Sequence, residues 1–385
     1  MGKNKQSHRT EGALIVKVVI RTDSSIRIGT GHLMRCLTLA DSLRRQGAEI
    51  VFICRNLEGH MARIARAKDY DVTMLPIPDA STKVKSPANE YDEWLGVEKD
   101  IDASQTLSAL SKLDVAVDWL IVDHYALDAD WERKVQPLVN NIMAIDDLAN
   151  REHSCDLLLD QNLFDSAEQR YAGLVPESCK MLLGPRYALL RDEFLYATEK
   201  KPMRDGSVRR LFVFFGGADP TNETGKTLKA IAMLQRPDIE VEVVIGGSNP
   251  HREELIRACS TSEYIKIHTE VDHIAELMSR ADIAIGGGGT TTWERCCLGL
   301  PSLIISIAEN QVEISRQADR SGIGCYLGKK ENVTSRHIFE QISTLLNHPE
   351  KLRQMSRCGT DLVDGRGTDK VTNCLNELVS RAVTS

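Results

Sequence analysis

The sequence predicts an α/β protein of two domains, each built on a parallel β-sheet. The chain has 385 residues, which is more than a single hydrophobic core usually fills. Short apolar segments alternate with helix-length segments, and this alternation starts again at residue 211, as expected for two α/β domains. Glycine-rich loops follow several of the apolar segments. In open parallel sheets, ligands bind at these carboxyl ends of the strands.

The composition narrows the class of partner. The net charge of −7 gives no support for a nucleic-acid or membrane-surface binder, because both favour basic patches. Residues 1–12 are polar and lack the apolar core of a secretion signal, so we expect a disordered polar tail. The ten cysteines form no C-x-x-C pair, which indicates reduced thiols rather than a zinc or redox site. We expect a monomeric, cytoplasmic protein with no metal and no cofactor, whose partner is a small molecule.

The first domain is predicted over residues 13–200 and is organised around the loop after its first strand. Apolar residues over 13–20 predict that strand, and apolar side chains at helical spacing predict the helix that follows. Between the two, Gly29 and Gly31 let the backbone bend and approach a ligand. His32 lies at the helix N-terminus, where free N–H groups favour an anionic partner, and it is the first candidate for chemistry. The alternative is that His32 only caps or pads the start of the helix.

Strands and helices alternate through the rest of the first domain. The predicted strands are 49–54, 71–75, 119–123, 142–145 and 156–160, and the predicted helices are 60–68, 91–113 and 128–139. Prolines and small polar residues over 76–87 predict a loop. A charged segment that contains Pro202 and Gly206 predicts the interdomain linker over 201–210.

Polar residues follow two of these strands where each strand ends. They are Asp123, His124, Tyr125, Asp146 and Asp147. In a parallel sheet they share one edge with the glycine loop, so they are candidate substrate contacts. The alternative is that the aspartates cap the helices that follow.

The second domain is predicted over 211–365. Its first strand, 211–215, runs into Gly216 and Gly217, and further strands are predicted at 240–245, 264–267, 283–285 and 302–305. Asn310 and Gln311 follow the last of these strands, and we expect both side chains to point at the same binding cleft. Residues 366–385 are predicted to form a C-terminal helix that packs back toward the first domain.

A second glycine-rich loop indicates phosphate binding. Four glycines separate the strand at 283–285 from the following helix, and threonines come next; the sequence is Gly286, Gly287, Gly288, Gly289, Thr290, Thr291. Without side chains, the backbone N–H groups and the threonine hydroxyls can reach a phosphate. Glu294 lies one turn into the helix, where its carboxylate is placed to accept hydrogen bonds from ribose hydroxyls. The alternative is a purely structural glycine turn.

The motifs together resemble those of the UDP-sugar hydrolases of pseudaminic acid biosynthesis, the PseG family. The resemblance rests on R-T-D-S-S-I-R-I-G-T-G-H-L-M-R-C-L-T-L-A at 21–40, L-G-P-R-Y-A-L-L-R-D-E-F at 183–194, F-F-G-G-A-D-P at 214–220, G-G-G-G-T-T-T-W-E at 286–294 and A-E-N-Q at 308–311. These motifs follow one another in order across most of the chain. Their combination is more specific than any single loop.

The resemblance implies two Rossmann-like domains in a GT-B-like arrangement, with a nucleotide-sugar cleft between them. It implies hydrolysis of UDP-2,4-diacetamido-2,4,6-trideoxy-β-L-altropyranose to UDP and the free sugar, a step toward flagellin glycosylation. His32 would then be the general base for a water that attacks the anomeric carbon with inversion. Asp23 and Arg35 would orient His32 or the sugar, and Arg191 would neutralise a phosphate. The glycine loops, Glu294 and Asn310 would hold UDP.

Two other functions remain open from the sequence. The first is a MurG-like transferase that moves the sugar to an acceptor instead of water. The second is a nucleotide-sugar-binding protein without turnover. The presence of His32 in the loop favours catalysis over binding alone.

Overall fold

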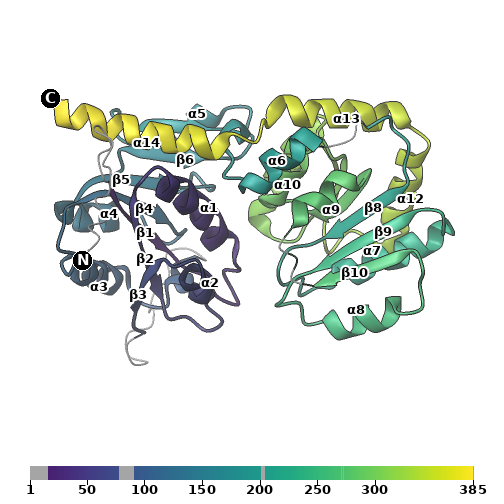
Figure 1. The fold of residues 1–385 in the computed structure, drawn as a ribbon, viewed down its shortest axis with the longest axis horizontal. Helices are drawn as coiled ribbons and strands as arrows, with labels where there is room; N and C mark the ends of the chain where they lie inside the picture. The colour runs from purple at the N-terminus through teal and green to yellow at the C-terminus, as the bar shows by residue number, and fades with distance from the viewer. Residues whose placement is uncertain (1–15, 78–90, 201–203, 270, 272, 385) are drawn as a thin grey trace, which may run out of the picture.

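The chain folds into two lobes that lie side by side (Figure 1), each with one parallel sheet between layers of helices. The computed structural model describes residues 16–77, 91–200, 204–269, 271 and 273–384. The predicted tail over 1–12 and most of the predicted loop over 76–87 lie outside these residues.

The first lobe contains a seven-stranded sheet in the order β3-β2-β1-β4-β5-β6-β7. Its strands are β1 (Lys17–Thr22), β2 (Glu49–Arg55), β3 (Asp71–Leu75), β4 (Val117–Asp123), β5 (Val139–Ile145), β6 (Leu157–Asp160) and β7 (Lys180–Leu183). All neighbouring pairs are parallel. β1 pairs with β2 on one side and β4 on the other. The chain direction therefore switches between β1 and β4, which is where open α/β sheets bind ligands.

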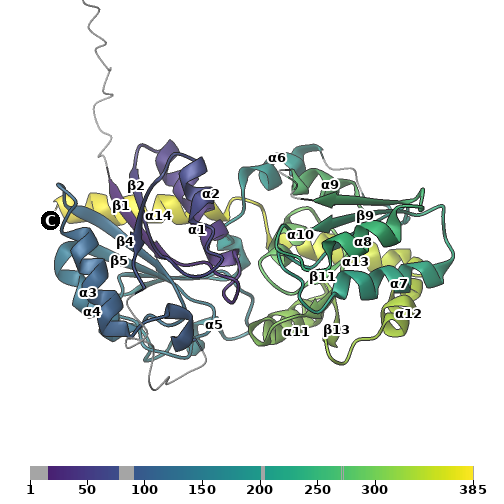
Figure 2. The same cartoon turned by 90° about the horizontal axis from the view of Figure 1, so that it is seen from below.

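Helices cover both faces of this sheet (Figure 2). They are α1 (Gly31–Arg45), α2 (Ala62–Ala67), α3 (Lys99–Leu110), α4 (Ala129–Val135) and α5 (Ala167–Arg170), with 3₁₀ turns η2 (Asp92–Leu95), η3 (Gln136–Leu138) and η4 (Pro185–Tyr187). The apolar side chains of β1 pack against the helices on both faces of the sheet. Val18 and Ile20 pack in the core that includes α1, whereas Val19 packs in the core on the opposite face. A strand buried on both faces is typical of a parallel sheet.

The second lobe contains a six-stranded parallel sheet in the order β10-β9-β8-β11-β12-β13. Its strands are β8 (Arg210–Phe214), β9 (Glu240–Ile245), β10 (Ile265–Thr269), β11 (Ile283–Gly287), β12 (Ser302–Ser306) and β13 (Cys325–Lys329). Its helices are α7 (Glu223–Leu234), α8 (Arg252–Cys259), α9 (Ile274–Arg280), α10 (Thr291–Cys297), η5 (Glu309–Gln311), α11 (Val312–Arg320), α12 (Ser335–Leu346) and α13 (Pro349–Leu362). The switch in chain direction lies between β8 and β11, so both predicted glycine loops flank it.

Two segments tie the lobes together. The helix α6 (Asp192–Lys200) packs against α9 and α10 of the second lobe, although the predicted domain boundary at residue 200 places it with the first. Arg204, in the predicted linker, donates to the carbonyl oxygens of Met278 and Ser279 (both 3.3 Å). The last helix, α14 (Gly367–Thr384), returns along the first lobe and packs on α1 (Figure 1).

Two secondary-structure predictions were wrong in detail. The predicted helix over 91–113 is broken into η2 and α3, because Gly96 takes a left-handed conformation (φ 74°) between them. The edge strands β7 and β13 were missed; β7 has only four residues, Lys180–Leu183.

Candidate active site

Loops from the two lobes meet at the C-terminal edges of the two sheets. Asn310 Nδ2, after β12, donates to the Tyr125 hydroxyl after β4 (3.4 Å). Trp293 Nε1 of α10 donates to Asn162 Oδ1 after β6 (3.2 Å). The loops after β4 and β6 therefore contact the second lobe at the edge of the sheets where the two switch points lie.

His32 lies at this edge, in the first turn of α1, and forms a pair with Asp123 at the end of β4. The distance between His32 Nδ1 and Asp123 Oδ1 is 2.6 Å. The sequence separation is 91 residues, and the pair forms because β1 and β4 are neighbours in the sheet. An ionised carboxylate only accepts hydrogen bonds, so we assign the His32 proton to Nδ1. Nε2 of the neutral ring then carries a lone pair, as a general base requires.

Arg35 fixes the Asp123 carboxylate in a bidentate ion pair. Its Nε donates to Asp123 Oδ2 and its Nη2 to Oδ1, both at 2.7 Å. Burial raises the pKa of the Asp123 carboxyl, but the charge of Arg35 and the hydrogen bonds from Arg35 and His32 outweigh burial and hold that pKa well below its usual range. The carboxylate therefore stays ionised at neutral pH. It can orient the His32 ring and stabilise the imidazolium that forms when the ring takes up a proton.

Aromatic rings surround His32. The Tyr125 ring packs edge-on against the His32 ring, with centroids 4.6 Å apart, and Trp94 lies 6.4 Å away. Tyr91 contacts both of these rings, at 4.9 Å from Trp94 and 5.1 Å from Tyr125. The sequence predicted a helix over residues 91–113 and gave no sign that Trp94 lies beside His32 or that Tyr91 packs on Trp94 and Tyr125.

Asp23 is not brought to His32, contrary to the expectation that it orients the histidine or the sugar. Arg21 holds its carboxylate through two hydrogen bonds (2.6 and 2.9 Å), and the backbone N–H of Arg55 donates to it as well (2.6 Å). Arg21 and Arg55 also bind Asp102 at 2.6 Å, and all four side chains are fully buried. Asp23 therefore belongs to an internal charge network, in which each buried charge needs its partner.

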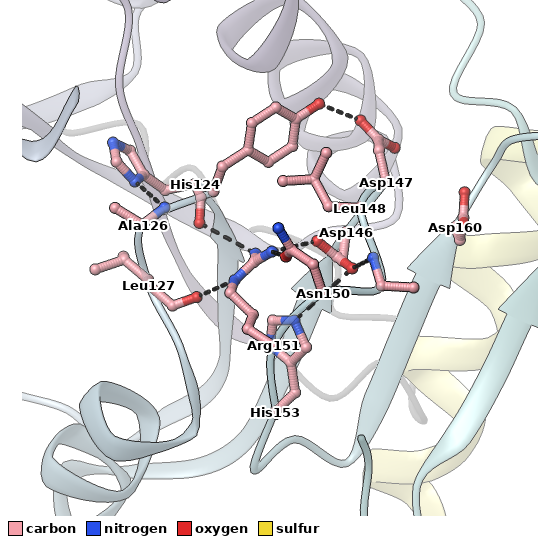
Figure 3. Close-up of polar contacts among 12 residues, drawn as sticks. His124, Ala126, Leu127, Asp146, Asp147, Leu148, Asn150, Arg151, His153 and Asp160 are labelled. Carbon is pink, nitrogen blue, oxygen red and sulfur yellow. Dashed lines mark hydrogen bonds and ion pairs between the residues drawn. The ribbon is translucent and has the colours of Figure 1, made fainter. Parts of the chain in front are cut away.

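His124 and Asp146 also brace the loops from inside. Burial lowers the pKa of His124 to about 4, so the ring is neutral at pH 7, and its Nδ1 accepts from the Ala126 N–H (3.1 Å). Asp146 accepts from Arg151 (2.6 Å), which also donates to the carbonyl oxygens of Leu127 and His124 (Figure 3). These contacts join the loop after β4 to the loop after β5. His124 and Asp146 are both buried and hold these loops from inside.

In the second lobe, the glycine loop between β11 and α10 is closely packed on one side. A Cβ on Gly286 would collide with the Phe214 carbonyl oxygen, and a Cβ on Gly288 with Ser315 Oγ. Gln311, which was expected to point at the ligand, instead accepts hydrogen bonds through Oε1 from the N–H groups of Gly288 (3.2 Å) and Ile307 (3.1 Å). The side-chain carbonyl oxygen of Gln311 therefore holds the loop.

We predict that Gly288→Ala lowers both the melting temperature and the affinity for UDP, because the added methyl displaces Ser315 or the loop. Ser315 cannot move freely, since its Oγ is hydrogen-bonded to Ser306 Oγ and to the backbone carbonyl oxygen of Gln311. Overpacking of this kind costs about 1–3 kcal/mol. Gly289→Ala is the matched control, because its Cβ would lie 3.6 Å from the nearest atom, an ordinary contact. Thermal denaturation tests the pair, and equal melting temperatures of the two variants would contradict the prediction. UDP titration compares Gly288→Ala with the wild-type protein.

Glu294 and Arg191 lie together at the same edge. Arg191 Nη1 binds Glu193 Oε1 (2.6 Å), and its Nη2 lies 3.6 Å from Glu294 Oε1. Burial raises the pKa of Glu294, and the charge of Arg191 lowers it only in part. Arg191 therefore lies between two carboxylates. Glu294 follows Thr290 and Thr291 by one turn of α10, as the sequence predicted.

The other predicted residues fall at the two switch points. A Cβ added at Gly29 or Gly31 would meet no atom within 4 Å, so the backbone there is open. Gly216 has a positive φ of 87°, and a Cβ on Gly217 would lie 3.7 Å from Thr30 Oγ1 of the first lobe.

In the part of the chain that the structure describes, no group of three or more His, Cys, Asp or Glu residues is arranged to hold a metal ion. Among the helices of the described ranges, none has the length and apolar character that a membrane crossing requires.

Comparison with known proteins identifies relatives of both lobes. Residues 210–365 match the glycosyltransferase family 28 C-terminal domain. A UDP-2,4-diacetamido-2,4,6-trideoxy-beta-L-altropyranose hydrolase from Campylobacter jejuni is 27% identical over 297 residues, which cover 77% of this chain and 93% of that protein. The spore coat polysaccharide biosynthesis protein SpsG of Bacillus subtilis is 30% identical over 203 residues, or 52% of this chain.

The coverage of the relatives differs. The match spans 59% of SpsG and 57% of an uncharacterized protein of Methanocaldococcus jannaschii that is 26% identical. Among solved structures, MurG of Acinetobacter baumannii superposes with a TM-score of 0.64 over 94% of this chain and 100% of that chain, at 12% identity. At this identity the likeness shows the fold, which is the GT-B arrangement expected from the sequence. These comparisons show that the chain is similar to a PseG-type hydrolase and to SpsG, and that its two parallel-sheet lobes have the GT-B fold.

Proposed function

We propose that the chain is a UDP-sugar hydrolase that cleaves UDP-2,4-diacetamido-2,4,6-trideoxy-β-L-altropyranose into UDP and the free sugar. The observation that carries this proposal is the His32–Asp123 pair at the first switch point, on the side where the lobes meet. The hydrolase relative, which is matched over 93% of its length, supports the choice of substrate. A monomeric state and a cytoplasmic location remain predictions.

The first lobe supplies the base in this mechanism. Nε2 of His32 takes a proton from a water molecule while the water oxygen forms a bond to the anomeric carbon. The bond between that carbon and the diphosphate oxygen breaks, and UDP leaves with the electron pair. Attack from the face opposite UDP inverts the anomeric centre. Asp123 holds the ring through Nδ1 and stabilises the imidazolium, which later loses its proton to solvent.

The second lobe holds the leaving group. Backbone N–H groups of the glycine loop other than that of Gly288, which Gln311 holds, together with the hydroxyls of Thr290 and Thr291, stabilise the negative charge that develops on the diphosphate. The loop with Gly216 and Gly217 lies on the other side of the second switch point. Asn310 faces the same edge through its contact with Tyr125. When UDP binds, Arg191 exchanges a carboxylate partner for a phosphate, as a partly exposed arginine can.

The test is a proton NMR time course of purified protein with this UDP-sugar, run in ordinary and in ¹⁸O-labelled water. Free sugar that carries the label and has inverted configuration would establish attack of water at carbon. Label in UDP would mean attack at phosphorus and would contradict the mechanism. Absence of reaction with this substrate, while UDP binds, would contradict the proposed substrate.

A transferase is the second candidate, because residues 210–365 match a glycosyltransferase domain and the fold is shared with MurG. A transferase releases sugar slowly without an acceptor, whereas a hydrolase needs only water. Turnover at a constant rate in buffer, unchanged by added lipid-linked or sugar acceptors, would decide against the transferase.

We predict that Glu294→Ala weakens UDP binding by about 10- to 100-fold, the loss of two hydrogen bonds from a charged acceptor to ribose hydroxyls. Calorimetric titration with UDP and with 2′-deoxy-UDP tests the position of the ribose. The wild-type protein should lose affinity for the deoxy nucleotide, whereas Glu294→Ala should bind both equally. Unchanged UDP affinity in Glu294→Ala would show that the ribose lies elsewhere.

A further inference from the structure

The Asp147 carboxylate, directly after β5, receives donors from three different parts of the first lobe. Oδ2 accepts from Arg35 Nη1 and from the Tyr125 hydroxyl, both at 2.7 Å. Oδ1 accepts from Asn162 Nδ2 at 2.9 Å. The side chain is only 9% exposed. Because both carboxylate oxygens of Asp147 bind protein groups, we look for its role in the positions of Arg35, Tyr125 and Asn162.

On one side, Asp147 determines the orientation of Arg35. The guanidinium of Arg35 uses Nε and Nη2 for Asp123 and Nη1 for Asp147. Asp147 therefore binds the third nitrogen of the Arg35 guanidinium, whose other two nitrogens bind Asp123, the partner of His32. If Asp147 is lost, the guanidinium can rotate and Asp123 loses one fixed edge of its bidentate pair.

On the other side, two donors of Asp147 reach the second lobe. The amide of Asn162 donates to Asp147 and accepts from Trp293 Nε1 (3.2 Å). The hydroxyl of Tyr125 donates to Asp147 and accepts from Asn310 Nδ2 (3.4 Å). Two short hydrogen-bonded routes therefore run from α10 and η5 to the same carboxylate.

Further hydrogen bonds join the two loops that carry Tyr125 and Asp147. Figure 3 shows Asp147 hydrogen-bonded to the neighbouring tyrosine, and Arg151 below it, which joins Asp146 to the carbonyl oxygens of His124 and Leu127. Because Arg151 fixes both loops, Asp147 and Tyr125 have little freedom to adjust separately. A change in either route to the second lobe is therefore passed to Arg35.

We propose that Asp147 is a positioning residue that makes the orientation of the His32–Asp123 pair depend on the docking of the second lobe. This inference rests on the proposed function of His32 as a base. Asp147 touches neither water nor sugar in the reaction. It acts through Arg35 and Asp123, and it aligns the base when the nucleotide-binding lobe is in place.

Asp147→Asn tests the first half of the proposal. The variant keeps the shape of the side chain but offers Arg35 an amide. We expect kcat to fall by about 30- to 100-fold, the scale of a misplaced catalytic group, with KM and UDP affinity within about threefold of wild type. Asp147→Glu, which keeps the charge, should recover part of the loss. In a His32→Ala background, Asp147→Asn should cause no further loss, because both act on the same step.

Asp165→Asn is the matched control. Asp165 also accepts a hydrogen bond across the lobes, from Gln317 Nε2 (3.2 Å), but its hydrogen bond does not involve Arg35. We expect wild-type kcat and KM. If Asp165→Asn lowered kcat as much as Asp147→Asn, the effect would be general loss of docking and the proposal would be overturned.

Trp293→Phe tests the link to the second lobe, because it removes the donor to Asn162. We expect a lower kcat in the otherwise wild-type protein and little further effect in Asp147→Asn. A Trp293→Phe effect that simply multiplies that of Asp147→Asn would show that the two residues act independently and would overturn the link.

An NMR measurement separates failure of this inference from failure of the proposed function. The hydrogen-bonded ring proton of His32 gives a downfield signal, assigned by its loss in His32→Gln, and it needs no turnover. We expect this signal to shift or broaden in Asp147→Asn and to stay unchanged in Asp165→Asn. An unchanged signal in Asp147→Asn overturns the inference whether or not the protein hydrolyses the sugar. A wild-type protein that releases no sugar overturns the proposed function alone.

Discussion

Replacement of His32 by alanine is expected to lower turnover by about 10²- to 10⁴-fold, the usual contribution of a positioned general base. UDP affinity should change little, because the nucleotide loops belong to the second lobe, whereas His32 lies on α1 of the first. The measurement combines steady-state kinetics with UDP titration of the same samples. Added imidazole should restore part of the lost activity, since a free base can enter the space that the side chain leaves.

The control for this substitution is His337→Ala, at a half-buried position of α12 in the second lobe. This variant should have wild-type kinetics. If His32→Ala retained full turnover, another residue would have to activate the water. If instead His32→Ala lost both turnover and UDP binding, the histidine would contribute to nucleotide binding and the division of roles between the lobes would be wrong.

The fold could be predicted because its signals are local. The strand β1 is apolar on both faces, and the glycine loops come directly after β1, β8 and β11. Alternating strands and helices, with a right-handed crossover between parallel strands, leave few possible arrangements. The sequence order of the elements therefore predicted two parallel sheets, and the comparison with MurG agrees with them.

The partners inside the site could not be predicted, because they depend on strand order. Asp123 pairs with His32 only because β4 lies beside β1, and the sequence does not reveal strand order. From the sequence alone, Asp23 was the more natural partner, since it is close to His32 along the chain. In the structure, however, the Asp23 carboxylate accepts two hydrogen bonds from Arg21, which lies two residues earlier on β1.

Side-chain direction limited the prediction in the second lobe. Gln311 follows a strand and lies in the predicted motif, but it is the last residue of the 3₁₀ turn η5, and its side-chain carbonyl oxygen turns back to the N–H groups of Gly288 and Ile307. Asn310, one position earlier, points to the first lobe and reaches Tyr125. A motif gives the position of both residues in the chain, but only the local backbone decides which of them faces the site.

Asp123→Asn is expected to lower kcat nearly as much as His32→Ala, by about 10²- to 10⁴-fold. An asparagine carbonyl cannot replace both carboxylate oxygens, and Asp123 receives two hydrogen bonds from Arg35 and one from His32. If the amide group faces His32, it donates to Nδ1 and forces the ring proton onto Nε2, which then cannot act as a base. The double variant with His32→Ala should be no slower than His32→Ala alone, because the carboxylate acts only through the ring.

Loss of a buried charge also destabilises the protein, so the effect on rate needs a control of equal burial. Asp23→Asn provides it. Asp23 is buried at the same sheet edge, is held by an arginine, and lies 3.5 Å from a histidine, His124, just as Asp123 lies beside His32. Both variants should lower the melting temperature, since each removes one of the two carboxylates that a buried arginine binds. Only Asp123→Asn should lower kcat per folded molecule by orders of magnitude. Equal loss of kcat in the two variants would mean that the rate reports general disruption of the sheet edge, and that the histidine and carboxylate pair has no special part in activating water.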